Sequence, residues 1–127
     1  MPTHTNKLLV FYGICLLVPI AGNTTDPPCA RRTDLAGACF RVRGNLKLFN
    51  GTPSARITVR GSKRLLGVVP YIADNNETFA APAEVRSHAS FDTPLLGDYL
   101  VCPLSKPRPH EMQQVCIESA TINTKSK

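Results

Sequence analysis

The feature that most constrains the fold is a run of alternating apolar and polar residues near the middle of the chain. Between residues 39 and 49, apolar side chains recur at every second position, so that Phe40, Val42 and Leu46 fall on one side of an extended chain. A period of two with aromatic and β-branched residues is typical of a half-buried strand. Two similar stretches, 54–60 and 63–69, follow turn-forming residues. The sequence therefore predicts strand, turn, strand, turn, strand.

The first turn, residues 50–53, limits how the first two predicted strands can pair. For their apolar residues to share one face, the connecting loop must contain an even number of residues. A two-residue type I′ turn at Asn50-Gly51 and a four-residue loop at 50–53 both satisfy this condition. The two-residue turn would place Val42 opposite Val59. Both possibilities give the same apolar face and the same polar face.

The remainder of the chain adds short elements separated by turn residues. Two further strands are predicted at 98–104 and 112–122, and a short helix is predicted at 82–89, with Pro82 at its first position. Residues 70–82 contain Asp-Asn-Asn and are predicted to form an exposed loop. This pattern favours a mainly β fold, a small antiparallel sandwich or barrel of about five strands. We expect one β domain over 39–122, after an irregular segment 23–38 and before a polar tail 123–127.

The first 22 residues resemble an export signal. An apolar run at 8–21 follows a polar start, and the small residues Ala21 and Gly22 precede the polar Asn23. The run is long enough for the core of a signal peptide and short for a membrane span. We expect residues 1–22 to be a signal peptide, with no transmembrane span after cleavage and a periplasmic or extracellular location. An uncleaved N-terminal anchor is the alternative.

Cysteine usage agrees with export. Once the predicted signal is removed, an even number of cysteines remains: Cys29, Cys39, Cys102 and Cys116. Such a set in an exported chain suggests two disulfides, for which three connectivities are possible. Cys102 and Cys116 lie symmetrically about the Pro-rich turn between the last two predicted strands, which favours a Cys102–Cys116 disulfide. Cys29 would then pair with Cys39. Free buried thiols are the alternative.

The sequence contains no arrangement of residues typical of a catalytic site. There is no Cys-x-x-Cys motif, no pair of His on a helix face and no glycine-rich phosphate loop, and His4, His88 and His110 lie outside any nucleophile motif. We therefore expect no enzyme activity and no cofactor. We expect no metal either, because cysteines in an oxidising compartment are bridged. Sequons at Asn23, Asn50 and Asn76 would matter only in a eukaryotic secretory pathway.

Positive charge is concentrated on the polar face of the predicted hairpin. The chain has a formal net charge of +6. The candidate binding residues are Arg41, Arg43, Lys47, Arg56, Arg60 and Arg64. Like charges opposed across a sheet cost stability unless something neutralises them, and Arg side chains bind phosphate or sulfate well. Nucleic acid is disfavoured because Phe49 alone offers a ring for stacking on this face. A solvated face that keeps the protein soluble is the alternative.

Two sets of residues resemble a group of small exported bacterial proteins of unassigned function. The first set is Cys39-Phe40-x-Val42-x-Gly44-x-Leu46 with Asn50-Gly51-Thr52-Pro53, and the second is Tyr99-x-Val101-Cys102-Pro103-Leu104 with Met112-Gln113-x-Val115-Cys116-Ile117-Glu118. The resemblance implies an envelope or secreted protein and carries no catalytic residues. The hairpin alone is also similar to transthyretin-like β-sandwich modules.

These observations point to a module that binds rather than catalyses. The expected partner is an anionic component of the envelope or cell surface. A structural or protein-interaction module of the envelope, with no small ligand, is the alternative, and an unrecognised hydrolase is a third reading.

Overall fold

The computed structural model describes Cys29 and residues 32–124, and the predicted signal peptide at 1–22 lies outside the described residues. The elements, in chain order, are β1 (Phe40–Leu48), β2 (Ala55–Val59), β3 (Leu65–Val68), β4 (Pro70–Ala73), β5 (Asn76–Phe79), α1 (Ala83–His88), β6 (Leu95–Pro103) and β7 (Gln113–Ile122). The predicted mainly β fold is confirmed. The predicted short helix is present as α1, and β6 begins three residues before the predicted position 98.

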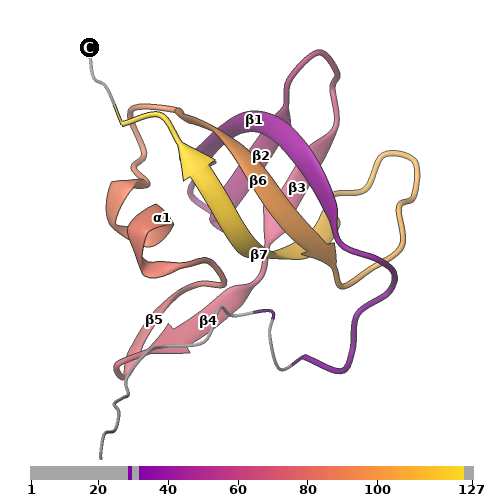
Figure 1. Cartoon of the computed structure of the whole chain (residues 1–127), viewed down its shortest axis with the longest axis horizontal. Helices are drawn as coiled ribbons and strands as arrows, with labels where there is room; N and C mark the ends of the chain where they lie inside the picture. Colours follow the sequence, from indigo (N-terminus) through magenta and orange to yellow (C-terminus); the bar gives the residue numbers. More distant parts are fainter. Residues whose placement is uncertain (1–28, 30–31, 125–127) are drawn as a thin grey trace, which may run out of the picture.

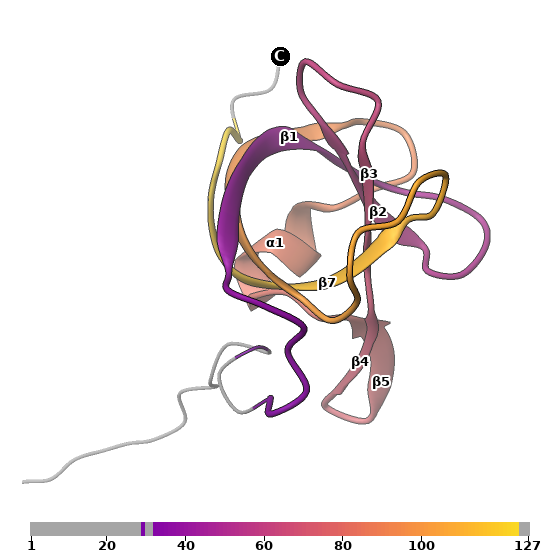
Figure 2. The ribbon, with the colours of Figure 1, turned by 90° about the vertical axis from the view of Figure 1, so that its right-hand side faces the viewer.

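Five strands close into a barrel in the order β1-β2-β3-β7-β6, and Figure 2 looks into its end. The spatial order β6-β1-β2-β3 is that of a Greek key, and a five-stranded Greek-key barrel is the architecture of the OB fold. All neighbouring strands are antiparallel except β3 and β7, which are parallel. This parallel pair was not expected. Parallel strands need a long connection, here residues 69–112, and local turn signals do not reveal which strands such a connection joins.

The β1–β2 hairpin uses the longer of the two loops that the sequence allowed. Leu48 pairs with Ala55, and the backbone N–H of Phe49 donates to the carbonyl oxygen of Ser54 at 2.8 Å. The loop is therefore 50–53, and the two-residue turn is wrong: Gly44, not Val42, pairs with Val59. The longer loop buries Pro53, whose ring packs against Gly67 of β3. The packing is so close that a Cβ at position 67 would lie 2.7 Å from Cγ of Pro53.

The interior of the barrel is mainly aliphatic, as the composition requires. The largest side chains with almost no exposure include Leu46, Ile57, Leu66 and Ile117. Tyr99 is also fully buried there, and its hydroxyl donates to the carbonyl oxygen of Leu95 at 2.6 Å. Burial raises the pKa of this phenol well above its ordinary value.

A second hairpin, β4–β5, occupies the region predicted as an exposed loop, so that prediction is wrong. Asp74 and Asn75 have φ angles of 52° and 66°, as a two-residue type I′ turn requires. The strands on either side pair from Pro70 with Phe79 to Ala73 with Asn76. The hairpin extends away from the barrel (Figures 1 and 2), and Ile72 on it is 64% exposed. The Asp-Asn turn was visible in the sequence, but the strands flanking it are only four residues long.

The helix α1 connects this hairpin to β6 and packs on the barrel through Val85, which is 1% exposed. Pro82 precedes the first helical residue as its N-cap. Among the described residues, no helix has the length and apolar character to cross a membrane.

Candidate functional site

Cationic side chains line the outer surface of β1, of β2 and of the residue that follows β2, which we call the basic face: Arg41, Arg43, Lys47, Arg56 and Arg60. They alternate with the inward-facing residues, as strand geometry requires. Lys47 pairs directly with Arg56, and the backbone N–H of Arg60 donates to the carbonyl oxygen of Arg43 at 2.8 Å. Cations are therefore opposed at two levels of the hairpin. The two-residue turn would have put Arg41 opposite Arg60, but the observed register places Arg43 there.

The part of the basic face around Arg43 is partly neutralised by a carboxylate on β6. Asp98 pairs with Arg43 in the β1–β6 register, and its Oδ2 lies 2.9 Å from Nη1 of Arg43. About half of each side chain is exposed, so the ion pair adds at most about 1 kcal/mol of stability. Sequence reasoning missed Asp98 because the closure that brings β6 beside β1 is non-local. Arg41 and Arg60 remain exposed on this part of the face.

The other part of the basic face, which carries Lys47 and Arg56, is organised around Phe49. Nζ of Lys47 lies 4.8 Å from the centre of the Phe49 ring, and Cζ of Arg56 lies 4.9 Å from it. Arg56 is also fixed by a hydrogen bond from its Nε to the carbonyl oxygen of Pro53 at 2.9 Å. Both cations are therefore held by the same aromatic ring, at the end of the hairpin where the 50–53 loop begins.

Arg64, the sixth predicted binding residue, is not on the basic face but in the wall of a neighbouring cavity. Its guanidinium lies 5.0 Å from the centre of the Phe40 ring, and its Nη2 donates to Oε1 of Gln113. Gln113 is only 5% exposed, and its Nε2 donates to the carbonyl oxygen of Ser105 at 2.9 Å. The buried amide of Gln113 therefore holds the guanidinium group of Arg64 in place.

The cavity beside Arg64 has a volume of about 540 Å³ and lies between the start of β3 and the loop 104–112. Its walls carry Lys63, Arg64, Arg108 and His110, one acidic residue, Glu111, and the apolar Leu65 and Met112. A smaller cavity of about 360 Å³ adjoins the 50–53 loop and contains both Arg86 and Glu77. Positive charge therefore predominates only in the larger cavity, which is the one that suits an anionic group.

The predicted disulfide connectivity is wrong. The disulfides join Cys29 to Cys116 and Cys39 to Cys102. Cys102 and Cys116 do lie opposite each other on β6 and β7, as the sequence indicated. However, the β1–β6 register brings Cys39 to the other side of Cys102, with a Cα–Cα distance of 4.0 Å, and Cys29 reaches Cys116 from the segment before β1. Long-range closure of the barrel, which local symmetry about a turn does not reveal, determines the pairing.

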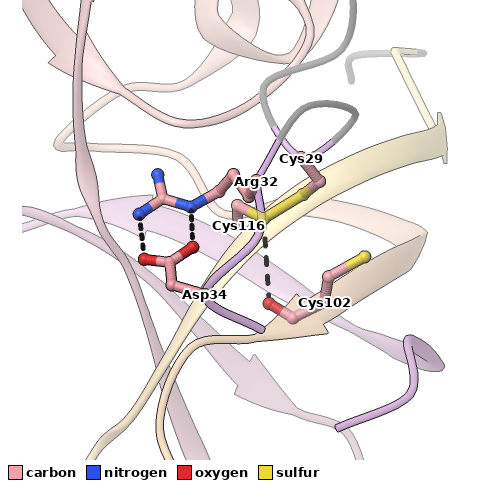
Figure 3. A network of polar contacts seen from close by, with 5 residues as sticks. All are labelled: Cys29, Arg32, Asp34, Cys102 and Cys116. Carbon is pink, nitrogen blue, oxygen red and sulfur yellow. Dashed lines mark hydrogen bonds and ion pairs between the residues drawn. A yellow bond between two sulfur atoms is a disulfide. The ribbon is translucent and has the colours of Figure 1, made fainter. Parts of the chain in front are cut away.

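Sulfur atoms from both disulfides gather at one place on the barrel wall. The Sγ atoms of Cys29, Cys102 and Cys116 lie within 4.8 Å of one another, and Figure 3 shows the three side chains together. All three belong to disulfides, so they are not thiolates that could bind a metal ion. Nearby, Arg32 donates to both carboxylate oxygens of Asp34 at 3.0 and 2.9 Å, which lowers the pKa of that carboxyl group.

Comparisons with family models, with curated proteins and with solved structures found no match to this chain. The resemblance to small exported bacterial proteins therefore stays a prediction. The two disulfides are consistent with an oxidising, exported location.

Proposed function

We propose that this protein is an exported binding module that holds an anionic polysaccharide of the envelope or cell surface on its basic face. The observation that carries the proposal is the direct opposition of Lys47 and Arg56 across β1 and β2, with both charges against Phe49. Opposed like charges destabilise a hairpin unless a counter-charge is present. A sulfate or carboxylate bound between them would turn that repulsion into attraction.

The spacing of the cations suits a polymer rather than a single small ion. Lys47 and Arg43 are four residues apart on one strand, which corresponds to about 13 Å along the face. A chain with repeated anionic groups could contact both levels of the hairpin at once. Arg64 and the cavity beside it add a further anion-binding position on β3. Guanidinium groups are well suited to sulfate and carboxylate because they donate two parallel hydrogen bonds.

The aromatic content of the face favours sugar over nucleic acid. Single-stranded nucleic acids are usually bound by several rings that stack on successive bases, whereas Phe49 is the one ring on this face and is already in contact with two cations. OB-fold proteins bind oligonucleotides or oligosaccharides on strands 2 and 3 and on the loops that join strands 1–2 and 4–5, so the basic face shares with them β2 and the 50–53 loop. That parallel is an analogy of fold, which by itself does not establish function.

Retention on a heparin column tests this proposal. We expect retention of the parent protein that weakens with salt, because exposed charges are screened within about 10 Å at 0.1 M. Replacing Arg41, Arg43 and Arg60 together with Gln should abolish retention. Two single variants of equal charge separate a site from net charge: Arg60→Gln should elute clearly earlier than Lys106→Gln, which alters an exposed loop. If the two variants elute at the same salt concentration, the basic face only keeps the protein soluble and is not a binding site.

Export is part of the same proposal and has its own test. Cleavage after the small residues at 21–22 would leave a mature chain that starts close to Asn23. The intact mass of protein recovered from the exported fraction should match that start. A mass that retains residues 1–21 would support an uncleaved anchor instead.

A protein-interaction module is the second candidate, and exposed apolar side chains favour it. Ile72 on the β4–β5 hairpin is 64% exposed, and Phe91 before β6 is 52% exposed. A partner that co-purifies independently of salt, and is lost in Ile72→Ser, would support this function over polysaccharide binding.

A further inference from the structure

We propose that Cys39 is a site of modification by small monothiols such as glutathione, and that Cys102 relays the exchange to the Cys29–Cys116 disulfide. Neither step depends on polysaccharide binding. The proposal rests on the unequal exposure of the four described cysteines and on the closeness of their sulfur atoms.

Among the described cysteines, Cys39 is the one that an external thiol can reach. A thiolate that breaks a disulfide must reach one of its sulfur atoms, so exposure decides which sulfur is attacked. Cys39 lies on the surface just before β1 and is exposed. Its partner Cys102 is 1% exposed, and Cys29 and Cys116 are 5% and 0% exposed. An external thiol therefore meets the Cys39–Cys102 disulfide at Cys39 and leaves Cys102 as the departing sulfur.

The departing sulfur is already beside the second disulfide. Sγ of Cys102 lies within 4.8 Å of the Sγ atoms of both Cys29 and Cys116. In Figure 3 Cys102 lies beside the Cys29–Cys116 disulfide with its sulfur turned away from that bond, and Sγ of Cys116 is 3.8 Å from the carbonyl oxygen of Cys102. Once Cys102 is released from Cys39, rotation of its side chain would bring its sulfur into contact with the Cys29–Cys116 disulfide.

The strand register selects Cys116 as the atom attacked. Cys102 and Cys116 are directly opposed on β6 and β7, and directly opposed strand residues can come within bridging distance. Attack at Cys116 also releases Cys29, which belongs to the irregular segment before β1.

The exchange balances in two steps. First, the glutathione thiolate attacks Sγ of Cys39, a glutathione–Cys39 disulfide forms, and Cys102 leaves as a thiolate. Second, the Cys102 thiolate attacks Sγ of Cys116, the Cys102–Cys116 bond forms, the Cys29–Cys116 bond breaks, and Cys29 takes up a proton from water. Two disulfides are present before and after the exchange: the Cys29–Cys116 and Cys39–Cys102 bonds are replaced by the Cys102–Cys116 bond and the glutathione–Cys39 mixed disulfide, and the free thiol passes from glutathione to Cys29. The segment carrying Cys29 thereby loses its covalent link to β7.

The direct test treats the parent protein with reduced glutathione, stops the exchange with acid, unfolds and alkylates the chain, and maps the linked peptides. We expect glutathione on Cys39, a Cys102–Cys116 linkage and alkylated Cys29. Glutathione on Cys39 together with alkylated Cys102 and an intact Cys29–Cys116 disulfide would overturn the relay. A Cys29–Cys102 linkage would overturn its direction, and adducts elsewhere, or none, would overturn the assignment of Cys39.

Two matched variants test the relay without added thiol. Cys39→Ser leaves Cys102 as a free thiol beside the remaining disulfide, and we expect a fraction of its molecules to carry the Cys102–Cys116 linkage with Cys29 alkylated. Cys102→Ser leaves a free thiol at exposed Cys39 instead, and its Cys29–Cys116 disulfide should stay intact. A Cys29–Cys116 disulfide that stays fully intact in Cys39→Ser, as in Cys102→Ser, would overturn the role of Cys102. Circular dichroism checks that each variant is folded, and the glutathione experiment on the parent decides the matter if one is not.

Discussion

Lys47 and Arg56 lie directly opposite each other on β1 and β2, and the charged groups of both lie within 5 Å of the centre of the Phe49 ring, at 4.8 and 4.9 Å. Two cations that would repel each other are therefore held by the negative face of one aromatic ring. The ring offsets part of the repulsion and keeps both side chains in place for an anion. This arrangement makes Phe49 as important to the proposed site as the cations themselves.

Phe49→Leu should weaken heparin binding and lower the stability of the protein modestly. Leucine keeps most of the apolar contact but has no ring to orient the cations, and a cation–π contact of this kind contributes about 0.5–1 kcal/mol. We expect the Kd for a heparin oligosaccharide to rise about two- to fivefold per lost contact, measured by calorimetry. Phe91→Leu, which removes an exposed ring away from the basic face, is the control and should leave the Kd unchanged. Equal effects of both variants would exclude an orienting role for Phe49.

Gly44→Ala should destabilise the barrel strongly. A Cβ at position 44 would lie 2.4 Å from the carbonyl oxygen of Thr58 and 3.0 Å from Cγ2 of Ile57, so β1 and β2 would have to separate. Overpacking of this kind costs about 1–3 kcal/mol. Urea unfolding should show a free energy of unfolding that is lower by that amount, with a correspondingly lower midpoint. At Gly37 a Cβ would meet only Pro103 at 3.8 Å, so Gly37→Ala is the control, and an equal loss there would argue against the close approach at Gly44.

Loss of the Cys29–Cys116 disulfide should reduce the free energy of unfolding by several kcal/mol. The two cysteines are 87 residues apart, but the Cys39–Cys102 disulfide already joins the chain between them. The loop that the Cys29–Cys116 bond closes therefore runs only through 29–39 and 102–116, and for such a loop of about 25 residues the chain-entropy model gives about 3–4 kcal/mol. Replacing both with Ala removes the cross-link without leaving a free thiol. Thermal unfolding should show a much lower midpoint for this pair than for the parent. A midpoint within a degree or two would mean that the segment before β1 is constrained equally well without the bond.

Local patterns in the sequence predicted the elements far better than the contacts between them. Alternation in the first two strands, and runs of strand-forming residues between turns for the other three, predicted the five barrel strands, and Pro82 marked the start of the helix, because these signals depend on neighbouring residues. The parallel β3–β7 pair and the Cys39–Cys102 disulfide depend on the closure of β6 against β1, which no turn residue specifies. The position of Cys102 opposite Cys116 was predicted correctly, but a cysteine has two neighbouring strands in a barrel, and its bond lies on the other side.

The candidate site divides in the same way. Residues on one strand, such as Arg41 and Lys47, alternate onto the basic face as the sequence predicted. Groups supplied by distant strands were missed: Asp98 neutralises Arg43 from β6, and Gln113 holds Arg64 from β7. A single sequence offers no signal for such partners, because they become neighbours only when the barrel closes.

The phenol of Tyr99 predicts a loss of stability at alkaline pH. Burial raises its pKa in the folded protein, whereas in the unfolded chain it ionises near its ordinary value of about 10. Above about pH 10 the unfolded chain therefore releases a proton that the folded protein retains, and stability falls by about 1.4 kcal/mol per pH unit until the folded phenol also ionises. Below that pH both states are protonated and the effect vanishes.

Tyr99→Phe isolates this effect, because phenylalanine cannot ionise. At pH 8 the variant should be less stable than the parent by about 0.5–1.5 kcal/mol, since it lacks the 2.6 Å hydrogen bond to the carbonyl oxygen of Leu95. Between pH 10 and 11.5 the difference should shrink or reverse, because only the parent gains an ionised phenol on unfolding. Urea unfolding at pH 8, 9, 10, 11 and 11.5 measures both curves. Parallel curves for Tyr99→Phe and the parent up to pH 11.5 would show that Tyr99 ionises at the same pH in the folded and unfolded chains.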